Sequence, residues 1–195
     1  MSNVSRVNGF RPVSHLNGSP YNGQVNIYAI PASDGTAVFV GDMVKLSGDS
    51  DALGVPTVIQ AAAGDAVLGA VVGFVPLYTN LALAGSYRLA STLRYAYVAD
   101  APDLIFEAQE DAVGGAMATT DVGLNVELIV GSGSTSTGQS GMQVDTSTKA
   151  TTATLALKIR GFVQRPDNEV GSANAKMLVS VNKHQLNSGT GSAGV

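Results

Sequence analysis

The chain of 195 residues is built from short apolar runs interrupted by clusters of Gly, Asp, Ser and Pro. Such clusters are typical of the turns between strands. No window of eleven or more residues keeps apolar side chains at the i, i+3, i+4 and i+7 positions of an amphipathic helix. The best helical candidate, residues 110–118, is weakened by two adjacent glycines. The pattern predicts an all-β fold, with apolar runs at 25–30, 37–46, 55–60, 66–75 and 87–99.

Apolar and polar side chains alternate along four segments, which is typical of antiparallel strands with one face against a core. We therefore expect a compact antiparallel β-barrel or β-sandwich over residues 25–186, folded as a single domain. The alternating apolar positions are Leu93, Tyr95 and Tyr97; Leu124, Val126, Leu128 and Val130; Leu155, Leu157 and Ile159; and Met177, Val179 and Val181.

Three segments lack this alternation. Residues 1–24 hold widely spaced large side chains that cannot bury one another, so we expect an extended N-terminal arm that lies on another surface. Residues 131–153 are rich in Gly, Ser and Thr and are predicted to form a loop excursion from one sheet. Residues 187–195 are expected to form a flexible tail.

Charge is scarce and unevenly placed. Charged residues make up 13% of the chain, and 11 bases against 15 acids give a net charge of −4, which disfavours general nucleic-acid binding. No apolar stretch is long enough for a signal peptide or a membrane span. Residues 95–148 contain eight acids and no base, whereas six bases follow. This asymmetry indicates either association with a copy or partner, or simply a solvated acidic face.

Motifs for site chemistry are incomplete. The strand-like ELIV leads into Gly131 and Gly133, as in a dinucleotide-binding turn, but position 136 is Ser instead of the third Gly. Read from Gly133, the same segment has phosphate-loop spacing, but Gln139 stands where the essential Lys belongs.

The residue types needed for metal binding and for nucleophilic catalysis are also scarce. Cys is absent, and the two histidines, His15 and His184, lie far apart in the sequence. The close Asp pairs, Asp49 with Asp51 and Asp100 with Asp103, are typical of turns. We therefore expect no catalytic residue, no cofactor, no metal ion and no small-molecule substrate.

Three blocks of sequence resemble tailed-bacteriophage head decoration proteins, also called capsid-stabilising or cement proteins. They are NGFRP at Asn8–Pro12, RPDNEVG at Arg165–Gly171 and VNKHQL at Val181–Leu186, and the resemblance extends over residues 8–186. It implies a β-tulip-like domain that is not an enzyme and that attaches to the outside of an icosahedral shell, commonly as a homotrimer. The implied partners are the major capsid protein and copies of the chain. The implied location is the virion, after synthesis in the cytoplasm of the host bacterium.

On this hypothesis the arm makes the capsid contact. Phe10 and Tyr21 would fill shallow pockets on the shell, while Arg6 and Arg11 would meet acidic shell surface. The subunit interface would join Lys158 and Arg160 to the acidic 95–148 segment of a neighbour. The alternatives are another virion component, such as a head-fibre base or tail subunit, and a carbohydrate-binding β module with Tyr87, Tyr95 and Tyr97 as its platform. The absence of Trp disfavours a sugar platform.

Overall fold

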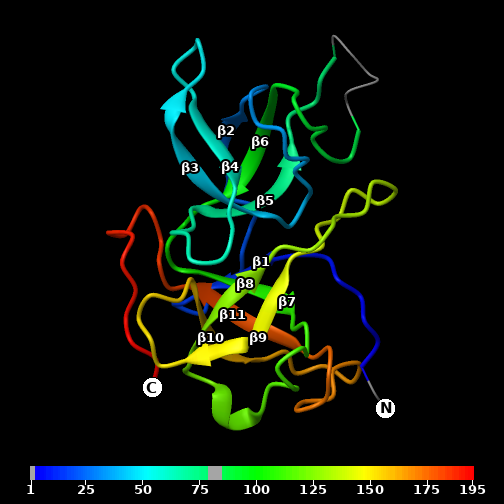
Figure 1. The fold of residues 1–195 in the computed structure, drawn as a ribbon, viewed down its shortest axis with the longest axis vertical. Helices are drawn as coiled ribbons and strands as arrows, with labels where there is room; N and C mark the ends of the chain where they lie inside the picture. The colour runs from blue at the N-terminus through cyan, green and yellow to red at the C-terminus, as the bar shows by residue number, and fades with distance from the viewer. Residues whose placement is uncertain (1–2, 79–84) are drawn as a thin grey trace.

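The computed structural model describes residues 3–78 and 85–195 and contains two β modules stacked along the long axis of the molecule (Figure 1). The barrel module is a closed barrel in the order β2-β4-β3-β5-β6. The sheet module is a six-stranded sheet in the order β1-β7-β11-β10-β8-β9. The described residues contain no α-helix, so the all-β prediction is confirmed.

The barrel module uses the apolar runs that the sequence predicted. Each run overlaps one strand, although β3 continues four residues past the run 37–46. The strands are β2 (Asn26–Ile30), β3 (Met43–Ser50), β4 (Pro56–Gln60), β5 (Gly69–Phe74) and β6 (Arg94–Ala99). All pairs are antiparallel except β2 with β4, which is parallel. The interior is filled by aromatic, branched and small apolar side chains, as suits a narrow five-stranded barrel. They include Tyr28, Ile30, Val44, Val58, Leu68, Val71, Ala96 and Val98.

Strand β6 turns the opposite face inward from the one its apolar alternation suggested. Ala96 and Val98 are fully buried, and Arg94 is 4% exposed, whereas Leu93 is 47% exposed. The Arg94 guanidinium donates hydrogen bonds to the carbonyls of two residues before the strand and lies 4.7 Å from the Phe74 ring centroid. Because Tyr28 and Ile30 already fill much of the narrow interior, β6 contributes small side chains to it and keeps its own tyrosines outside, which explains the inversion.

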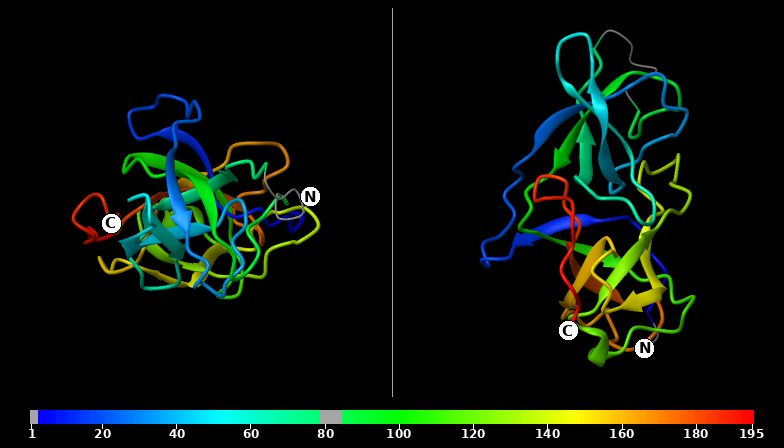
Figure 2. Two further views of the ribbon diagram at one scale, coloured as in Figure 1. Left: turned by 90° about the horizontal axis from the view of Figure 1, so that it is seen from above. Right: turned by 60° about the vertical axis from the view of Figure 1, so that its left-hand side comes forward.

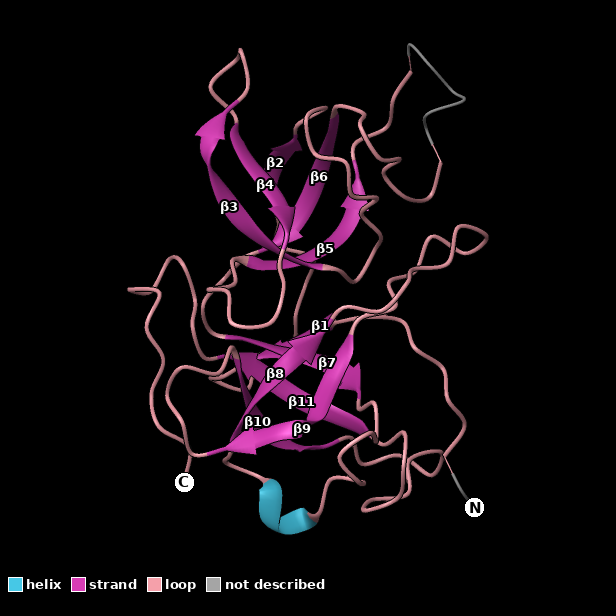
Figure 3. Cartoon of the chain, in the orientation of Figure 1, coloured by secondary structure: helices cyan, strands magenta, loops and turns pink. Residues whose placement is uncertain are grey.

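The sheet module is wholly antiparallel and curls back on itself (Figure 3). An isolated bridge joins Glu110, just after β7, to Val144 in the edge strand β9. The predicted alternation is confirmed in β10 and β11, where Leu157, Ile159 and Met177 face the core. The strands are β1 (Arg11–His15), β7 (Leu104–Gln109), β8 (Asn125–Ile129), β9 (Gln143–Ala150), β10 (Leu157–Phe162) and β11 (Lys176–Val181).

The N-terminal segment is extended, but it lies on the chain itself. Strand β1 pairs with β7, with Arg11 opposite Glu107, and Phe10 is 1% exposed within the main apolar cluster. The expectation of an arm that owes nothing to the β fold is therefore wrong, because its partner strand lies some ninety residues away, where local periodicity cannot reveal it. Gly9 has a φ of +69°, and a Cβ there would lie 2.4 Å from the Gly41 carbonyl oxygen. The segment thus fits tightly between the modules.

One apolar cluster joins the two modules. It contains Phe106, Leu128 and Leu157 from the sheet module, together with Met43, Val67 and Ala99 from the barrel module. The loop before β9 also crosses to the barrel, since the Val40 N–H donates to the Gly138 carbonyl and the Ser140 N–H donates to the Val40 carbonyl. The modules therefore share a core. The right-hand view of Figure 2 shows them stacked one above the other.

Two further sequence predictions need correction. Only the first part of residues 131–153 is a loop, because Gln143–Ala150 forms β9 with Val144 fully buried. Residues 187–195, expected to be a flexible tail, are held by hydrogen bonds. The Gly194 N–H donates to the Thr151 carbonyl, and Asn125 Nδ2 donates to the Ser192 carbonyl. Polar side chains in these low-complexity segments find their partners far away in the sequence. The helical candidate 110–118 is irregular, and a 3₁₀ turn, η2 (Thr119–Asp121), follows it.

Candidate functional site

Strands β1, β7, β11 and β10 present a cationic outer face. Phe106, Met177 and Ile159 point into the core, so the residues that alternate with them point outward. Arg11 lies opposite Glu107, and Lys158 lies opposite Ser180. Arg160 sits at the bulge in β10, and its Nε donates to Ser180 Oγ at 2.8 Å, which places it beside Lys158. We call this surface the cationic face; its bases are Arg6, Arg11, Lys158, Arg160, Arg165 and Lys176.

The charge of the cationic face differs in sign from that of the whole chain. Its six bases are accompanied by three acids, Glu107, Asp167 and Glu169, while the rest of the chain holds five bases and twelve acids. Arg165 makes a two-pronged pair with Glu107, at 3.1 and 2.7 Å, and this pairing raises the pKa of Arg165. Lys176 and Arg165 both lie 3.3 Å from Asp167. These contacts hold two of the long cationic side chains in fixed positions.

Four of the sequence-predicted contact residues meet on this face. Arg6 and Arg11 were assigned to the capsid and Lys158 and Arg160 to a subunit interface, yet all four belong to one surface of one sheet. Lys158 lies at its margin, where Nζ donates to the carbonyl of Ala193 in the tail at 2.9 Å. Sequence reasoning missed Arg165 and Lys176, although the excess of bases after residue 148 was a usable signal.

Three of the eight acids in segment 95–148 are buried inside the fold. Asp100, Glu110 and Glu127 are buried, with exposures of 6%, 0% and 6%. Asp121 pairs with Lys149 at 2.8 Å, and Glu107 belongs to the cationic face. The three buried carboxylates are unavailable to a neighbour, so the predicted subunit interface of Lys158 and Arg160 with this segment stays a prediction that depends on its remaining acids.

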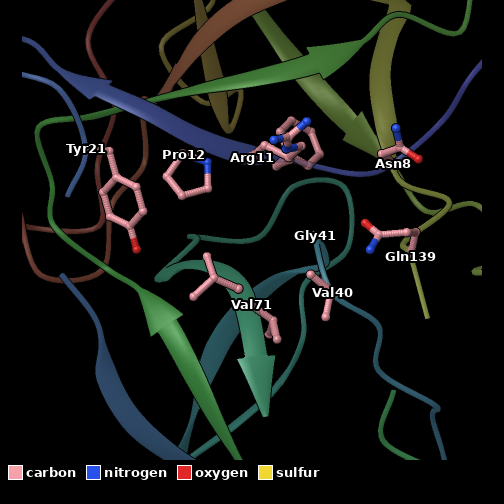
Figure 4. Close-up of a pocket in the computed structure, with 10 residues that line it drawn as sticks. Asn8, Arg11, Pro12, Tyr21, Val40, Gly41, Val71 and Gln139 are labelled. Atoms are coloured by element: carbon pink, nitrogen blue, oxygen red, sulfur yellow. The ribbon is translucent and has the colours of Figure 1, made fainter. Parts of the chain in front are cut away.

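A groove of roughly 430 Å³ separates the N-terminal segment from the base of the barrel (Figure 4). Half-buried Pro12, Val40 and Val72 supply its apolar surface, with Phe10 and Val71 buried behind them, and Arg11 lies on the β1 wall. Tyr21 stands at one end, and the amides of Asn8 and Gln139 stand at the other. The volume falls within the range of about 300–1,000 Å³ typical of ligand pockets, so the groove can accept a side chain or a short segment. We call it the junction groove.

The two predicted aromatic anchors have different outcomes. Phe10 cannot fill a pocket on another protein, because its side chain is buried in the chain's own core. Tyr21 is half-buried against the same cluster, and its hydroxyl donates to the Gln24 carbonyl at 3.1 Å. Burial and the Asp100 carboxylate raise the pKa of Tyr21. Its ring borders the junction groove, so it remains available to an occupant of that groove.

Buried polar groups elsewhere stabilise the fold. Arg88 is fully buried and donates to the carbonyls of Pro31, Asp34, Thr36 and Thr92. Tyr28 donates to Asp100 at 2.6 Å, and burial followed by that carboxylate raises the pKa of the Tyr28 phenol. His184, 2% exposed, lies between the modules. Burial lowers its pKa, while the Asp100 carboxylate and the backbone of Asp100 and Leu68 oppose that shift.

The Asp pairs and the glycine-rich segment have structural partners. Asp51 accepts hydrogen bonds from the N–H groups of Leu53 and Val55, as expected of turn chemistry. Asp103 accepts from His15 at 3.0 Å. Gly133 lies against the Phe39 ring, where a Cβ would be 2.3 Å from Cδ2, so this glycine serves close packing. Phe39 also stacks on Tyr87, with centroids 4.8 Å apart, so one face of the Tyr87 ring is covered.

Among residues 3–78 and 85–195, no group of three His, Asp or Glu side chains is arranged to hold a metal ion. Within the same residues, no helix has the length and apolar character needed to cross a membrane. Comparison of the chain with family models, curated proteins and solved structures finds no match. Function is therefore inferred from the chain's own residues.

Proposed function

We propose that the chain is a structural virion protein that binds the outer surface of a tailed-phage capsid and stabilises the shell as a homotrimer. The cationic face is the observation that carries the proposal, because six bases gather there in a chain whose net charge is −4. Such a face favours docking on an acidic surface. The identification of that surface as a phage shell rests on the resemblance of NGFRP, RPDNEVG and VNKHQL to decoration proteins.

The composition of the face favours a protein partner over a nucleic acid. Glu107 and Asp167 lie among the bases, and Arg165 is already paired with Glu107. Ile105 and Leu178, both half-buried, occupy outward positions beside them. Mixed charges with an apolar centre suit a protein interface, in which Arg is enriched. Phosphate backbones favour cations without interleaved acids.

Two of the distinctive sequence blocks, NGFRP and RPDNEVG, have structural roles that support the proposed attachment surface. NGFRP places Gly9 and Phe10 between the modules. RPDNEVG provides Arg165 for the Glu107 pair, and Asn168, whose side chain donates to the carbonyls of Val163 and Lys176. These residues hold the cationic face in shape, and we infer that the blocks mark the architecture of an attachment protein.

The test measures attachment to shells stripped of decoration. Charge reversal of two face residues, Lys158→Glu with Arg160→Glu, is compared with Lys45→Glu with Lys183→Glu, which changes the net charge equally away from the face. We expect the first pair to weaken co-sedimentation with shells at least tenfold, and the second pair to change it less than about twofold. Equal effects of the two pairs, or tighter wild-type binding to duplex DNA than to shells, would contradict the proposal.

A further inference from the structure

The hairpin of β3 and β4, whose tip we call the apolar knob, stands at the far end of the barrel from the sheet module (Figure 1). Strands β3 and β4 form a hairpin whose tip carries Leu53 with 82% of its surface exposed. A single exposed leucine is ordinary on a protein surface, so its use as a contact depends on how it is held and on the charges around it.

Hydrogen bonds hold the tip in one conformation. Asp51 Oδ1 accepts from the Leu53 and Val55 N–H groups at 2.9 and 2.8 Å, and the Gly54 N–H donates to the Asp51 carbonyl. Asp51 Oδ2 accepts from the Tyr95 hydroxyl, so the tip is also tied to β6. A leucine presented by a fixed turn loses little conformational entropy when it is bound, which favours its use as an anchor.

The junction groove complements this knob in charge and offers it apolar surface. Pro12, Val40 and Val72, all half-buried, supply that surface, and Arg11 lies on one wall. Arg6 and Arg11 also border the neighbouring hollow beside Glu107. The hairpin tip carries Asp49 and Asp51 and no base. A leucine flanked by acids thus matches an apolar groove flanked by bases.

We propose that the β3–β4 hairpin tip of one copy docks in the junction groove of a second copy, with Leu53 in the groove and Asp49 toward Arg11. Knob and groove lie on different parts of the molecule, so the contact is head-to-tail and repeats until a ring closes. The inference rests on the proposed function only for the number of copies in the ring, which is three if the chain is a homotrimer.

The first test uses the absence of Cys from the chain. Under mild oxidation, the double variant Leu53→Cys with Gln139→Cys is expected to form interchain disulfides that end in a closed trimer on a non-reducing gel. Val113→Cys with Gln139→Cys is the matched control, because Val113 is 77% exposed on a loop of the other module. The proposal is overturned if the Leu53 pair cross-links no more than this control.

The second test measures mass by sedimentation across a range of concentrations. Leu53→Asp is expected to raise the concentration needed for self-association at least tenfold, whereas Val113→Asp leaves it unchanged. A wild-type chain that is monomeric throughout, or a Leu53→Asp variant that associates like wild type, refutes the docking. Binding to shells is measured in a separate experiment. Self-association without attachment to shells would refute the proposed function and leave the docking intact. Loss of shell binding in Asn8→Trp, with self-association intact, would assign the groove to the shell.

Discussion

Phe10→Ala tests most sharply whether the N-terminal segment belongs to the fold. The Phe10 side chain is 1% exposed and packs in the cluster that joins the modules. Truncation of a buried Phe to Ala typically costs about 3–5 kcal/mol, through lost burial and the cavity left behind. For a chain of this length, each kcal/mol shifts Tm by roughly 2–4 °C, so we expect Tm to fall by about 10 °C.

The assay is urea denaturation, supported by thermal melting, with Leu16→Ala as the control. Leu16 lies in the same segment but is 48% exposed, so its truncation should cost less than about 0.5 kcal/mol. A chain shortened to begin at Gln24 should lose β1 as well and be less stable than Phe10→Ala. If Phe10→Ala matches wild type in stability while binding shells more weakly, Phe10 is a capsid anchor after all and the assignment made here is wrong.

Three further predictions concern the interior. Gly9→Ala should lower the free energy of unfolding by more than about 2 kcal/mol, because Gly9 has a φ of +69° and the new Cβ would lie 2.4 Å from the Gly41 carbonyl oxygen. The control is Gly35→Ala, whose Cβ would have nothing within 4 Å, and equal urea midpoints of the two variants would refute this prediction. Arg88→Lys should lower the free energy of unfolding by roughly 3 kcal/mol, since one ammonium cannot replace the guanidinium at four carbonyls. A loss of stability below about 1 kcal/mol would contradict this prediction. The pKa of His184 in the folded state lies below its unfolded value near 6.5. The contribution of His184 to the free energy of unfolding is therefore complete above pH 6.5 and is lost as the pH falls toward the folded-state pKa. His184→Gln should therefore flatten the decline of stability below about pH 6.5, and an unchanged slope would exclude this residue.

The shared core also predicts how the whole chain unfolds. Met43 and Val67 of the barrel module lie in one cluster with Phe106 and Leu157 of the sheet module. We therefore expect a single transition by both calorimetry and fluorescence, in keeping with the predicted single domain. Two separate transitions would show that the modules fold independently.

Local periodicity predicted some strands well, because their burial follows from neighbouring residues. In β10 and β11, Leu157, Ile159 and Met177 alternate with polar side chains and face the core as expected. In β6 the same rule selected the wrong face, because tyrosines tolerate a half-exposed position while Arg94 satisfies its charge with carbonyls inside the barrel mouth.

Long-range pairings lay outside the reach of sequence reasoning. Strand β1 forms by pairing along β7, from Arg11 opposite Glu107 to His15 opposite Leu104, and nothing local around Arg11 indicates a strand. The bases of the cationic face were predicted as contact residues in four of six cases. That they share one surface depends on the strand order β1-β7-β11-β10, which no pattern in the chain specifies.

The most direct test of the proposed function is a cryo-EM reconstruction of the phage particle that carries this chain. We predict three copies around local three-fold positions on the outside of the shell, with the outer face of β1, β7, β11 and β10 toward the major capsid protein. Copies located on the tail or at a fibre base, or copies on the shell with this face toward solvent, would contradict the account.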